Sequence, residues 1–305
     1  MTLTIRAFRT SDAEAACAAL RAGRPYLVTT PAAVAWQLAT HPHLRMLLAV
    51  RDGAVAAVAR YGPYPDSASP GYGFATLHVV PDRRRRGTGG ALLDATERAL
   101  AAEGVRHLHV RADHTAAAHA FATARGYRAG RIAHVSRCDL TGPLPPVPAA
   151  PPGIELRTAA DFLDDPRPIH QVDVEGTRDE PGDLQLGDQG YESWLAEIWH
   201  RPDLDHRLTT VAVDAADGRP VAFAAAQTDG EGRYWSSFTT TRGAYRGRGI
   251  AKLAKADSLH RARAAGLGAA YTHNDAANAP MLAVNAWLGY RRCAAERTWT
   301  RDLTG

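Results

Sequence analysis

The sequence predicts an α/β protein made of two tandem domains. Its 305 residues exceed what one hydrophobic core usually supports, and 45% of them are hydrophobic. A proline-rich stretch divides the chain into halves of similar length, and both halves show the same order of expected strands and helices. These three observations define the fold class.

The division lies at "TGPLPPVPAAPPG", residues 141–153, which contains six prolines. Proline fixes φ and lacks a backbone N–H, so neither a helix nor a central strand continues through this stretch. It is typical of a semi-rigid linker. We therefore predict an N-terminal domain over residues 1–142, a linker over 143–153 and a C-terminal domain over 154–305.

Each half opens on an alternating strand, "LTIRAFR" or "GIELRTA", followed by helical stretches and a hairpin with an Asp-Gly turn. A strand, an arginine-glycine turn, a helix, another strand and another helix follow. The first helix after the turn in the N-terminal half ends near Gly104. Its counterpart over 250–265 is rich in alanine and less clearly amphipathic. The apolar face of the first helix contains Leu92, Leu93, Thr96, Ala99 and Leu100.

The arginine-glycine turns are "RRRRGTGGALL" from Arg83 and "RGRGIAKLAK" from Arg246. One constant offset aligns Arg246 with Arg84 and Gly249 with Gly87. With one more residue added, "GYRAGRIAHVSRCDLTG" at 126–142 aligns with "GYRRCAAERTWTRDLTG" at 289–305. The agreement at both places indicates an ancient duplication rather than two unrelated basic turns.

Each turn has the chemistry of an anion site. A strand that ends in Arg-x-x-Gly-x-Gly/Ala and leads directly into a helix presents backbone N–H groups at the positive end of the helix dipole. Glycines let a ligand approach the backbone, and the arginines add charge-assisted hydrogen bonds. Phosphate or pyrophosphate is the expected guest. The spacing matches neither the nucleoside-triphosphate loop nor the dinucleotide fingerprint.

The two stretches "LHVVPDRRRRGTGGALL" and "FTTTRGAYRGRGIAKLAK" resemble the acetyl-CoA-binding motif of the GCN5-related N-acetyltransferase (GNAT) family. The resemblance covers both halves, as in the tandem members that include mycothiol synthase. It implies, in each domain, a mixed sheet flanked by helices that splays at its centre. It also implies that the turns hold the coenzyme A pyrophosphate and that the preceding strand ends contact the pantetheine arm. The implied coenzyme-binding residues are His78, Val80, Arg84, Arg85, Arg86, Gly87, Thr88 and Gly89 in the first half, and Thr239, Thr241, Arg246, Gly247, Arg248, Gly249, Ile250, Ala251 and Asn278 in the second.

The chain departs from the family at a tyrosine that often protonates the leaving thiolate. Asn285 occupies that position in the second half and Ala122 in the first. A general acid accelerates such a step by about 10²–10⁴, so its loss slows a transferase without abolishing it. Asn285 can still donate a hydrogen bond to sulfur, whereas Ala122 cannot. We therefore expect the second domain to be the catalytic one.

Two further features concern acids and amides near that site. Asp179 and Glu180 lie in a Pro/Gly-rich loop and are candidates for the base that deprotonates the acceptor, although a solvated charged loop explains them as well. Asn274 and Asn278 surround an expected helix start. One of them can be an N-cap, a ligand contact or both.

The expected function is transfer of an acetyl group from acetyl-CoA, the cosubstrate, to a primary amine of a small molecule by direct attack in a ternary complex. Two alternatives stay open. One is an aminoacyl-tRNA-dependent transferase on the same fold, for which strongly salt-dependent binding would speak. The other is a non-catalytic protein that binds acyl-CoA or another ligand.

Composition and charge narrow the classes of partner expected for this protein. The net charge of +4 is moderate and favours no nucleic-acid partner. No signal peptide or apolar run of about 18 residues is present, so we expect a cytoplasmic protein without a membrane partner. Three distant cysteines argue against a disulfide framework. His107, His109 and His114 have no completing ligand, so no metal site is predicted. The pattern specifies neither the acceptor nor the oligomeric state.

Overall fold

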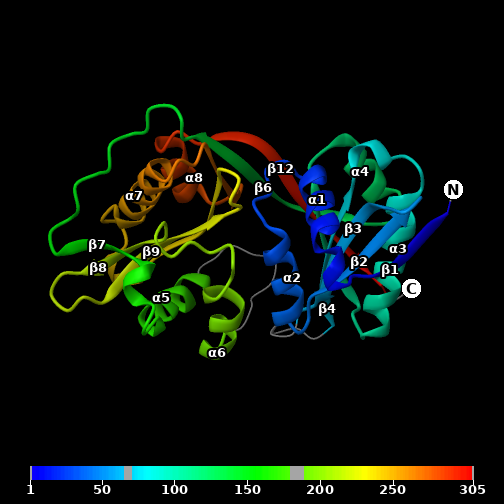
Figure 1. Ribbon diagram of the computed structural model, residues 1–305, viewed down its shortest axis with the longest axis horizontal. Coiled ribbons are helices and arrows are strands. Elements are labelled where there is room, and N and C mark those ends of the chain that lie inside the picture. Colours follow the sequence, from blue (N-terminus) through cyan, green and yellow to red (C-terminus); the bar gives the residue numbers. More distant parts are fainter. Residues whose placement is uncertain (1, 65–70, 179–188, 304–305) are drawn as a thin grey trace. The chain divides into compact units, whose positions relative to one another are not determined.

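The computed structural model describes residues 2–64, 71–178 and 189–303, and it contains two compact units (Figure 1). The described residues 2–133 and 294–303 form the first unit, and 134–178 and 189–293 form the second. Within this part of the chain, no helix has the length and the apolar character needed to cross a membrane.

The first unit is a mixed sheet in the order β1-β2-β3-β4-β5-β12, in which only β4 and β5 pair in parallel. Met46 and Leu48 pack in the cluster formed with α1, whereas Ala49 packs with Leu92 of α3, so the two helices cover opposite faces. The elements up to the linker are β1 (Leu3–Ala7), α1 (Ala13–Gly23), α2 (Pro31–Thr40), β2 (Arg45–Arg51), β3 (Ala54–Pro63), β4 (Tyr72–Val79), α3 (Thr88–Ala102), β5 (His107–Asp113), α4 (Ala116–Thr123) and β6 (Arg128–Asp139).

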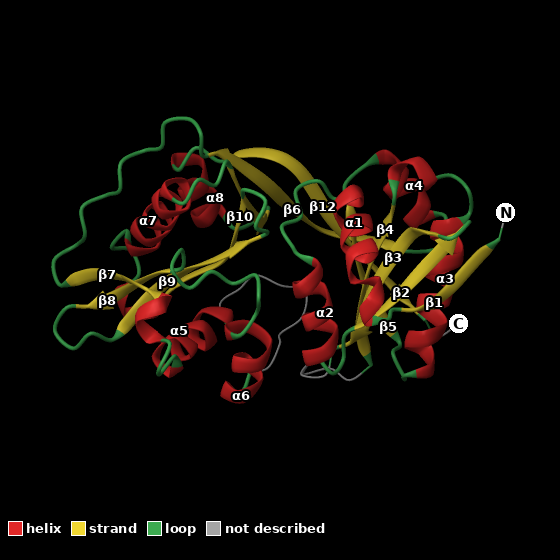
Figure 2. Cartoon of the chain, viewed as in Figure 1, coloured by secondary structure: helices red, strands yellow, loops and turns green. Residues whose placement is uncertain are grey.

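The second unit repeats this plan with the order β6-β11-β10-β9-β8-β7 and one parallel pair, β10 with β11. Helix α7 packs against β8, β9 and β10, and α5 lies on the other side of the sheet (Figure 2). Its elements are β7 (Ile154–Thr158), α5 (Arg167–Thr177), α6 (Tyr191–Trp194) continued by a π-helical turn (Leu195–Trp199), β8 (Thr210–Asp214), β9 (Pro220–Thr228), β10 (Arg233–Thr241), α7 (Ile250–Ala264), β11 (Ala269–Asp275), α8 (Ala279–Trp287) and β12 (Arg291–Asp302).

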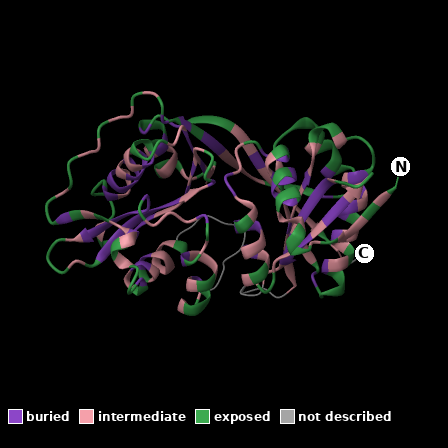
Figure 3. Cartoon of the chain, in the orientation of Figure 1, coloured by how far each residue is buried: buried purple, intermediate pink, exposed green. Residues whose placement is uncertain are grey.

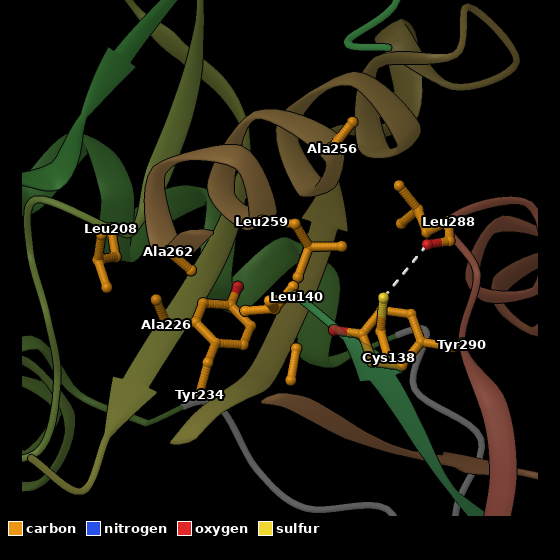
Figure 4. Packing of buried hydrophobic residues seen from close by; sticks show 11 residues of the cluster. Cys138, Leu140, Leu208, Ala226, Tyr234, Ala256, Leu259, Ala262, Leu288 and Tyr290 are labelled. Carbon is orange, nitrogen blue, oxygen red and sulfur yellow. Dashed lines mark hydrogen bonds between the residues drawn. The ribbon is translucent and has the colours of Figure 1, made fainter. Parts of the chain in front are cut away.

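The core of the second unit lies on both faces of the sheet, under α5 and α6 on one side and under α7 on the other. Strands β8 and β9 are almost wholly buried, as their continuous apolar runs predict (Figure 3). The aromatic rings of Tyr234 and Tyr290 pack with small and aliphatic side chains of α7, and the Cys138 thiol donates to the Leu288 carbonyl at 3.5 Å (Figure 4). This packing fixes α7 on the strands that border the site.

The duplication is visible element by element. Helices α3 and α7 are both 15 residues long and begin after Gly87 and Gly249, which the sequence alignment pairs. In α3, Leu92, Leu93, Thr96 and Leu100 are buried as predicted, and Ala99 is partly buried. The Asp-Gly turn at Asp52 has both residues at positive φ, which suits a two-residue hairpin.

The last strand of each half differs from the predicted arrangement. Residues Glu296–Asp302 of β12 pair antiparallel with Asp113–His107 of β5 in the first unit, and β6 ends beside β11 in the second. The compact units are therefore not the contiguous ranges 1–142 and 154–305, because the halves exchange these strands. Exchange of equivalent elements is inexpensive, and the aligned stretches 126–142 and 289–305 have equal length and the same ending.

Candidate functional site

The two arginine-glycine turns follow the same backbone path. Arg84 and Arg246 are extended, with φ of −69° and −67°, and the glycine that caps each helix is left-handed, with φ of 76° at Gly87 and 80° at Gly249. The Arg84 Nε donates to the Val79 carbonyl at 3.1 Å, and the Arg246 Nε donates to the Thr241 carbonyl at 3.0 Å. Each arginine is thus anchored on the strand that precedes its turn.

The glycine caps leave the helix starts open. Neither Gly87 nor Gly249 supplies a capping side chain, and a Cβ at either position would meet no atom within 4 Å. Positive φ explains why glycine is preferred there, and the open space leaves room for a ligand against the first N–H groups of α3 and α7. These ends have the geometry and the charge for an anion.

Both sheets splay beside their turns. Strands β4 and β5 pair from Tyr72 to Thr76, and β10 and β11 pair from Arg233 to Ser236, although all four strands continue beyond these positions. A cavity occupies each splay. The first has a volume of about 530 Å³ and the second about 580 Å³. The expected splayed mixed sheet is confirmed in both units.

The first cavity receives part of the predicted set. His78, Arg84, Arg85, Gly87 and Gly89 line it. Three other predicted residues are not among its described lining residues: Val80 packs on the core beside α1, the exposed Arg86 accepts a bond from Arg51 through its carbonyl, and Thr88 is buried with an unpartnered hydroxyl. Their contact with a coenzyme stays a prediction.

The second cavity receives nearly all of its set. Of the residues predicted for the second half, Arg248 is absent from the described lining of this cavity. Its guanidinium donates instead to the Pro152 carbonyl at 2.9 Å. Asn278 is the N-cap of α8, accepting from the Met281 N–H at 3.2 Å, so the expected cap is confirmed. It also lines the cavity, and its contact with a ligand stays a prediction. The lining includes Thr239, Thr241, Arg246, Gly247, Gly249, Ile250, Ala251 and Asn278.

Asn285 is not one of the described residues that line this cavity. It is buried, and its amide donates to the Asn274 Oδ1 at 2.6 Å, while Asn274 does line the cavity. Its amide N–H is therefore engaged by Asn274. The role of Asn285 at the sulfur stays a prediction. Asp179 and Glu180 lie outside the described residues.

The matched positions of the two cavities differ in polarity. The first cavity has Leu77, Val79, Leu93 and Val110 where the second has Thr239, Thr241, Lys255 and Thr272. The hydroxyls of Thr239 and Thr241 are buried and have no hydrogen-bond partner among the described residues. Buried hydroxyls are normally bonded, so this pair indicates a polar ligand in the second cavity.

Lys255 was missed from the sequence, although a signal was present. The weak amphipathicity of the stretch 250–265 arises partly because Lys255 occupies the buried face of α7. Its side chain is 1% exposed, and burial lowers the pKa of Lys255 to about 7.

A second difference lies in the strand beside the splay. The pairing of β10 with β9 shifts between Ser236 and Phe238, so Ser237 is an extra residue without a partner on β9. Strand β4 pairs with β3 without such a shift. A bulge releases a backbone N–H from the ladder and turns it toward neighbouring groups. Ser237 lines the second cavity.

Paired charges lie beside the first cavity, whose lining includes Asp113 and His78. Glu296, inserted by β12, forms an ion pair with Arg24 at 3.0 Å and accepts from the Tyr26 hydroxyl at 2.9 Å. The same hydroxyl donates to Asp113 at 3.0 Å. Burial and the Arg24 guanidinium lower the pKa of the adjacent His78 well below its usual value. These groups are engaged with one another.

Two anion cradles beside two splayed sheets define a tandem acetyltransferase architecture. A model of the acetyltransferase (GNAT) family matches residues 14–127 and 174–290, which is most of the chain, so the protein belongs to this family. Acetyl transfer is the activity of the class.

Individual relatives agree with this assignment. Mycothiol acetyltransferase of Thermomonospora curvata is 29% identical over 266 residues, 83% of this chain and 80% of that protein. A tandem GNAT protein from the clavulanic acid biosynthesis pathway has a TM-score of 0.74 at 20% identity, covering 100% of this chain and 99% of that one. A GCN5-related N-acetyltransferase from Sphaerobacter thermophilus has a TM-score of 0.72 at 21% identity, with 99% and 96% covered. The structural likenesses establish the tandem fold.

Proposed function

We propose that this protein transfers an acetyl group from acetyl-CoA to a primary amine of a small molecule, and that the second unit performs the transfer. One observation carries the choice of unit: the cradles are alike, but the second cavity alone of the two described here combines a strand bulge at Ser237 with hydroxyl and amine side chains. The name of the similar mycothiol enzyme supports a small-molecule acceptor.

Different residues of the second unit bind different parts of acetyl-CoA along the cavity. The first N–H groups of α7 and the Arg246 guanidinium hold pyrophosphate at the mouth. The hydroxyls of Thr239 and Thr241 satisfy the amides of a pantetheine arm. The Ser237 N–H, freed by the bulge, stabilises the oxyanion that forms when the acceptor nitrogen attacks the acetyl carbonyl. Acetyl-CoA supplies the activated acyl group, so no covalent enzyme intermediate is required.

The first unit supplies a second cradle with a closed reaction end. Its cavity has aliphatic side chains at the matched positions, and Asp113 and Glu296 are paired with Arg24 and Tyr26. This arrangement supports coenzyme binding without transfer.

Calorimetric titration with acetyl-CoA tests the assignment. Each of two variants, Gly87→Glu and Gly249→Glu, places a carboxylate where pyrophosphate belongs and removes binding to that cradle, since like charges repel in a confined site. We expect the site that supports turnover to be lost in Gly249→Glu and kept in Gly87→Glu. A wild-type protein that binds no acetyl-CoA contradicts the proposal and favours the RNA-dependent or the ligand-sensing alternative.

A further inference from the structure

Lys255 lies at the deep end of the second cavity. Its Nζ donates to the Thr272 hydroxyl at 3.5 Å and lies 5.3 Å from the centre of the Tyr290 ring. Thr272 is paired with Ser236, the last position at which β10 and β11 are joined before they separate. The amine therefore lies at the point where the splay begins.

No carboxylate among the described residues neutralises this amine. Within the described residues Lys255 forms no ion pair, and burial is the cause of its lowered pKa of about 7. Burying an unpaired amine is costly, whereas the first unit fills the matched position with Leu93 at no such cost. The second unit thus retains a buried amine that lowers its stability, although the first unit packs the matched position with leucine.

The dimensions of the cavity place Lys255 at the far end of a pantetheine arm. From Gly249 to Lys255 the helix rises about 9 Å. From Thr241 at the mouth to Ser236 at the vertex, β10 spans about 16 Å. An extended pantetheine arm has this length. A ligand with its pyrophosphate on the cradle brings its sulfur to the vertex beside the amine.

We propose that the Lys255 ammonium stabilises the thiolate of coenzyme A as the acetyl group leaves, an inference that rests on the proposed transfer. The acceptor nitrogen forms the C–N bond and releases a proton to solvent, and the C–S bond breaks with its electron pair on sulfur. The ammonium donates a hydrogen bond to that thiolate and keeps its own proton. The thiolate takes up a proton from solvent when coenzyme A leaves the site.

The ammonium has no carboxylate partner among the described residues, so a thiolate beside it supplies the missing counter-charge. Tyr290 lies under the amine with its pKa raised by burial, and Tyr234 has its pKa raised to about 12 for the same reason, so both phenols stay neutral. Other titratable or charged groups line the same cavity or pack in the neighbouring core. They are Lys252 on α7, Cys138 on β6, His273 on β11 and Arg246 on the turn.

The test compares binding of two ligands, coenzyme A and its thioether S-methyl-coenzyme A, to wild type and Lys255→Met. An ammonium beside the sulfur binds coenzyme A as thiolate, which is seen by its ultraviolet absorbance at pH 7. We expect Lys255→Met to lose that absorbance and to bind coenzyme A about tenfold more weakly, the effect of one charge-assisted hydrogen bond. Its affinity for the thioether should be unchanged.

Two further variants make the result decisive. Lys252→Met removes the other lysine of the cavity, and we expect it to weaken both ligands equally while the thiolate absorbance persists. Lys255→Arg keeps a positive charge if the methionine variant is unstable, and it should retain the thiolate. Equal thiolate absorbance in wild type and Lys255→Met, or equal weakening of both ligands, overturns the proposal. A wild type that binds neither ligand refutes the proposed function itself.

Discussion

The side chain of Lys255 shows how one residue separates two nearly equivalent helices. Helix α7 places it where α3 has Leu93, so the two buried faces differ by a charge. Sequence periodicity does not locate such a residue, because a lysine within a helix is normally assigned to the solvent face. Only the packing of α7 against the splay reveals it.

The lowered pKa of Lys255 predicts a pH-dependent stability. Between about pH 7 and its usual pKa of 10.5, the unfolded chain binds a proton that the native protein has released, so the free energy of unfolding rises with pH. Lys255→Met should therefore be more stable than wild type at pH 7, by about 1.4 kcal/mol for each unit of pKa shift, and equally stable near pH 10.5.

Urea unfolding at several pH values measures this difference. Leu93→Met, at the matched position of the first unit, changes no ionisable group and should differ from wild type by a constant amount. A constant difference for Lys255→Met as well would show that the buried amine does not titrate as described.

Asn278 combines a cap with a cavity position, and the two roles can be separated. Serine caps a helix as well as asparagine does, so Asn278→Ser should keep the stability of α8 to within about 0.5 kcal/mol. The shorter side chain no longer reaches a ligand, and we expect acetyl-CoA to bind about tenfold more weakly. Thermal melting and calorimetry measure the two effects. The control is Thr115→Ser, the matched cap of α4. Unchanged affinity in Asn278→Ser would leave the cap as its role.

At the scale of helices and strands, the sequence predicts the chemistry of the two turns but not the register in which neighbouring strands pair. The turns were found because positive φ at Gly87 and Gly249, and anion chemistry at Arg84 and Arg246, are encoded within a few residues. The bulge at Ser237 depends on the register with β9, which no local pattern in "RYWSSFTTT" specifies. Sequence reasoning therefore located the mouths of the cavities and missed their deep ends.

The predicted coenzyme-binding residues show the same limit of prediction from local sequence. Arg84 and Arg248 both belong to the basic turns, yet Arg84 lines a cavity and the guanidinium of Arg248 donates to Pro152. Both arginines lie within an arginine-glycine turn, so their position in the sequence does not predict which guanidinium faces a cavity. The partner of each guanidinium depends on segments that are distant in the chain, such as the linker.

At the scale of the whole molecule, the exchanged strands explain why the domain boundaries could not be taken from the proline-rich linker. The stretches 126–142 and 289–305 have equal length and the same ending, so either one fits beside β5. The two strands differ at several buried positions, and one of these carries a charge. Glu296 of β12 pairs with Arg24, whereas the aligned residue of β6 is Ala133.

This difference predicts the behaviour of the isolated fragment 1–142. With β6 in place of β12, the fragment keeps the Asp113 carboxylate at 4.0 Å from Arg24 but loses the closer Glu296, and a buried charge that loses its main partner costs several kcal/mol. Ala133→Glu should restore the pair and stabilise the fragment by about 3 kcal/mol, measured by urea unfolding. Ala129→Glu, at an exposed position of the same strand, should have little effect. A fragment that Ala133→Glu does not stabilise would refute the proposed exchange of equivalent strands.

The central claim is that the second unit transfers the acetyl group, and thiol release from acetyl-CoA in the presence of a panel of primary amines tests it most directly. The measurement compares wild type, Gly87→Glu and Gly249→Glu with an amine that the wild type uses. Turnover that survives in Gly87→Glu and disappears in Gly249→Glu is the predicted result. Turnover that survives in Gly249→Glu and disappears in Gly87→Glu would place the chemistry in the first unit and contradict the account.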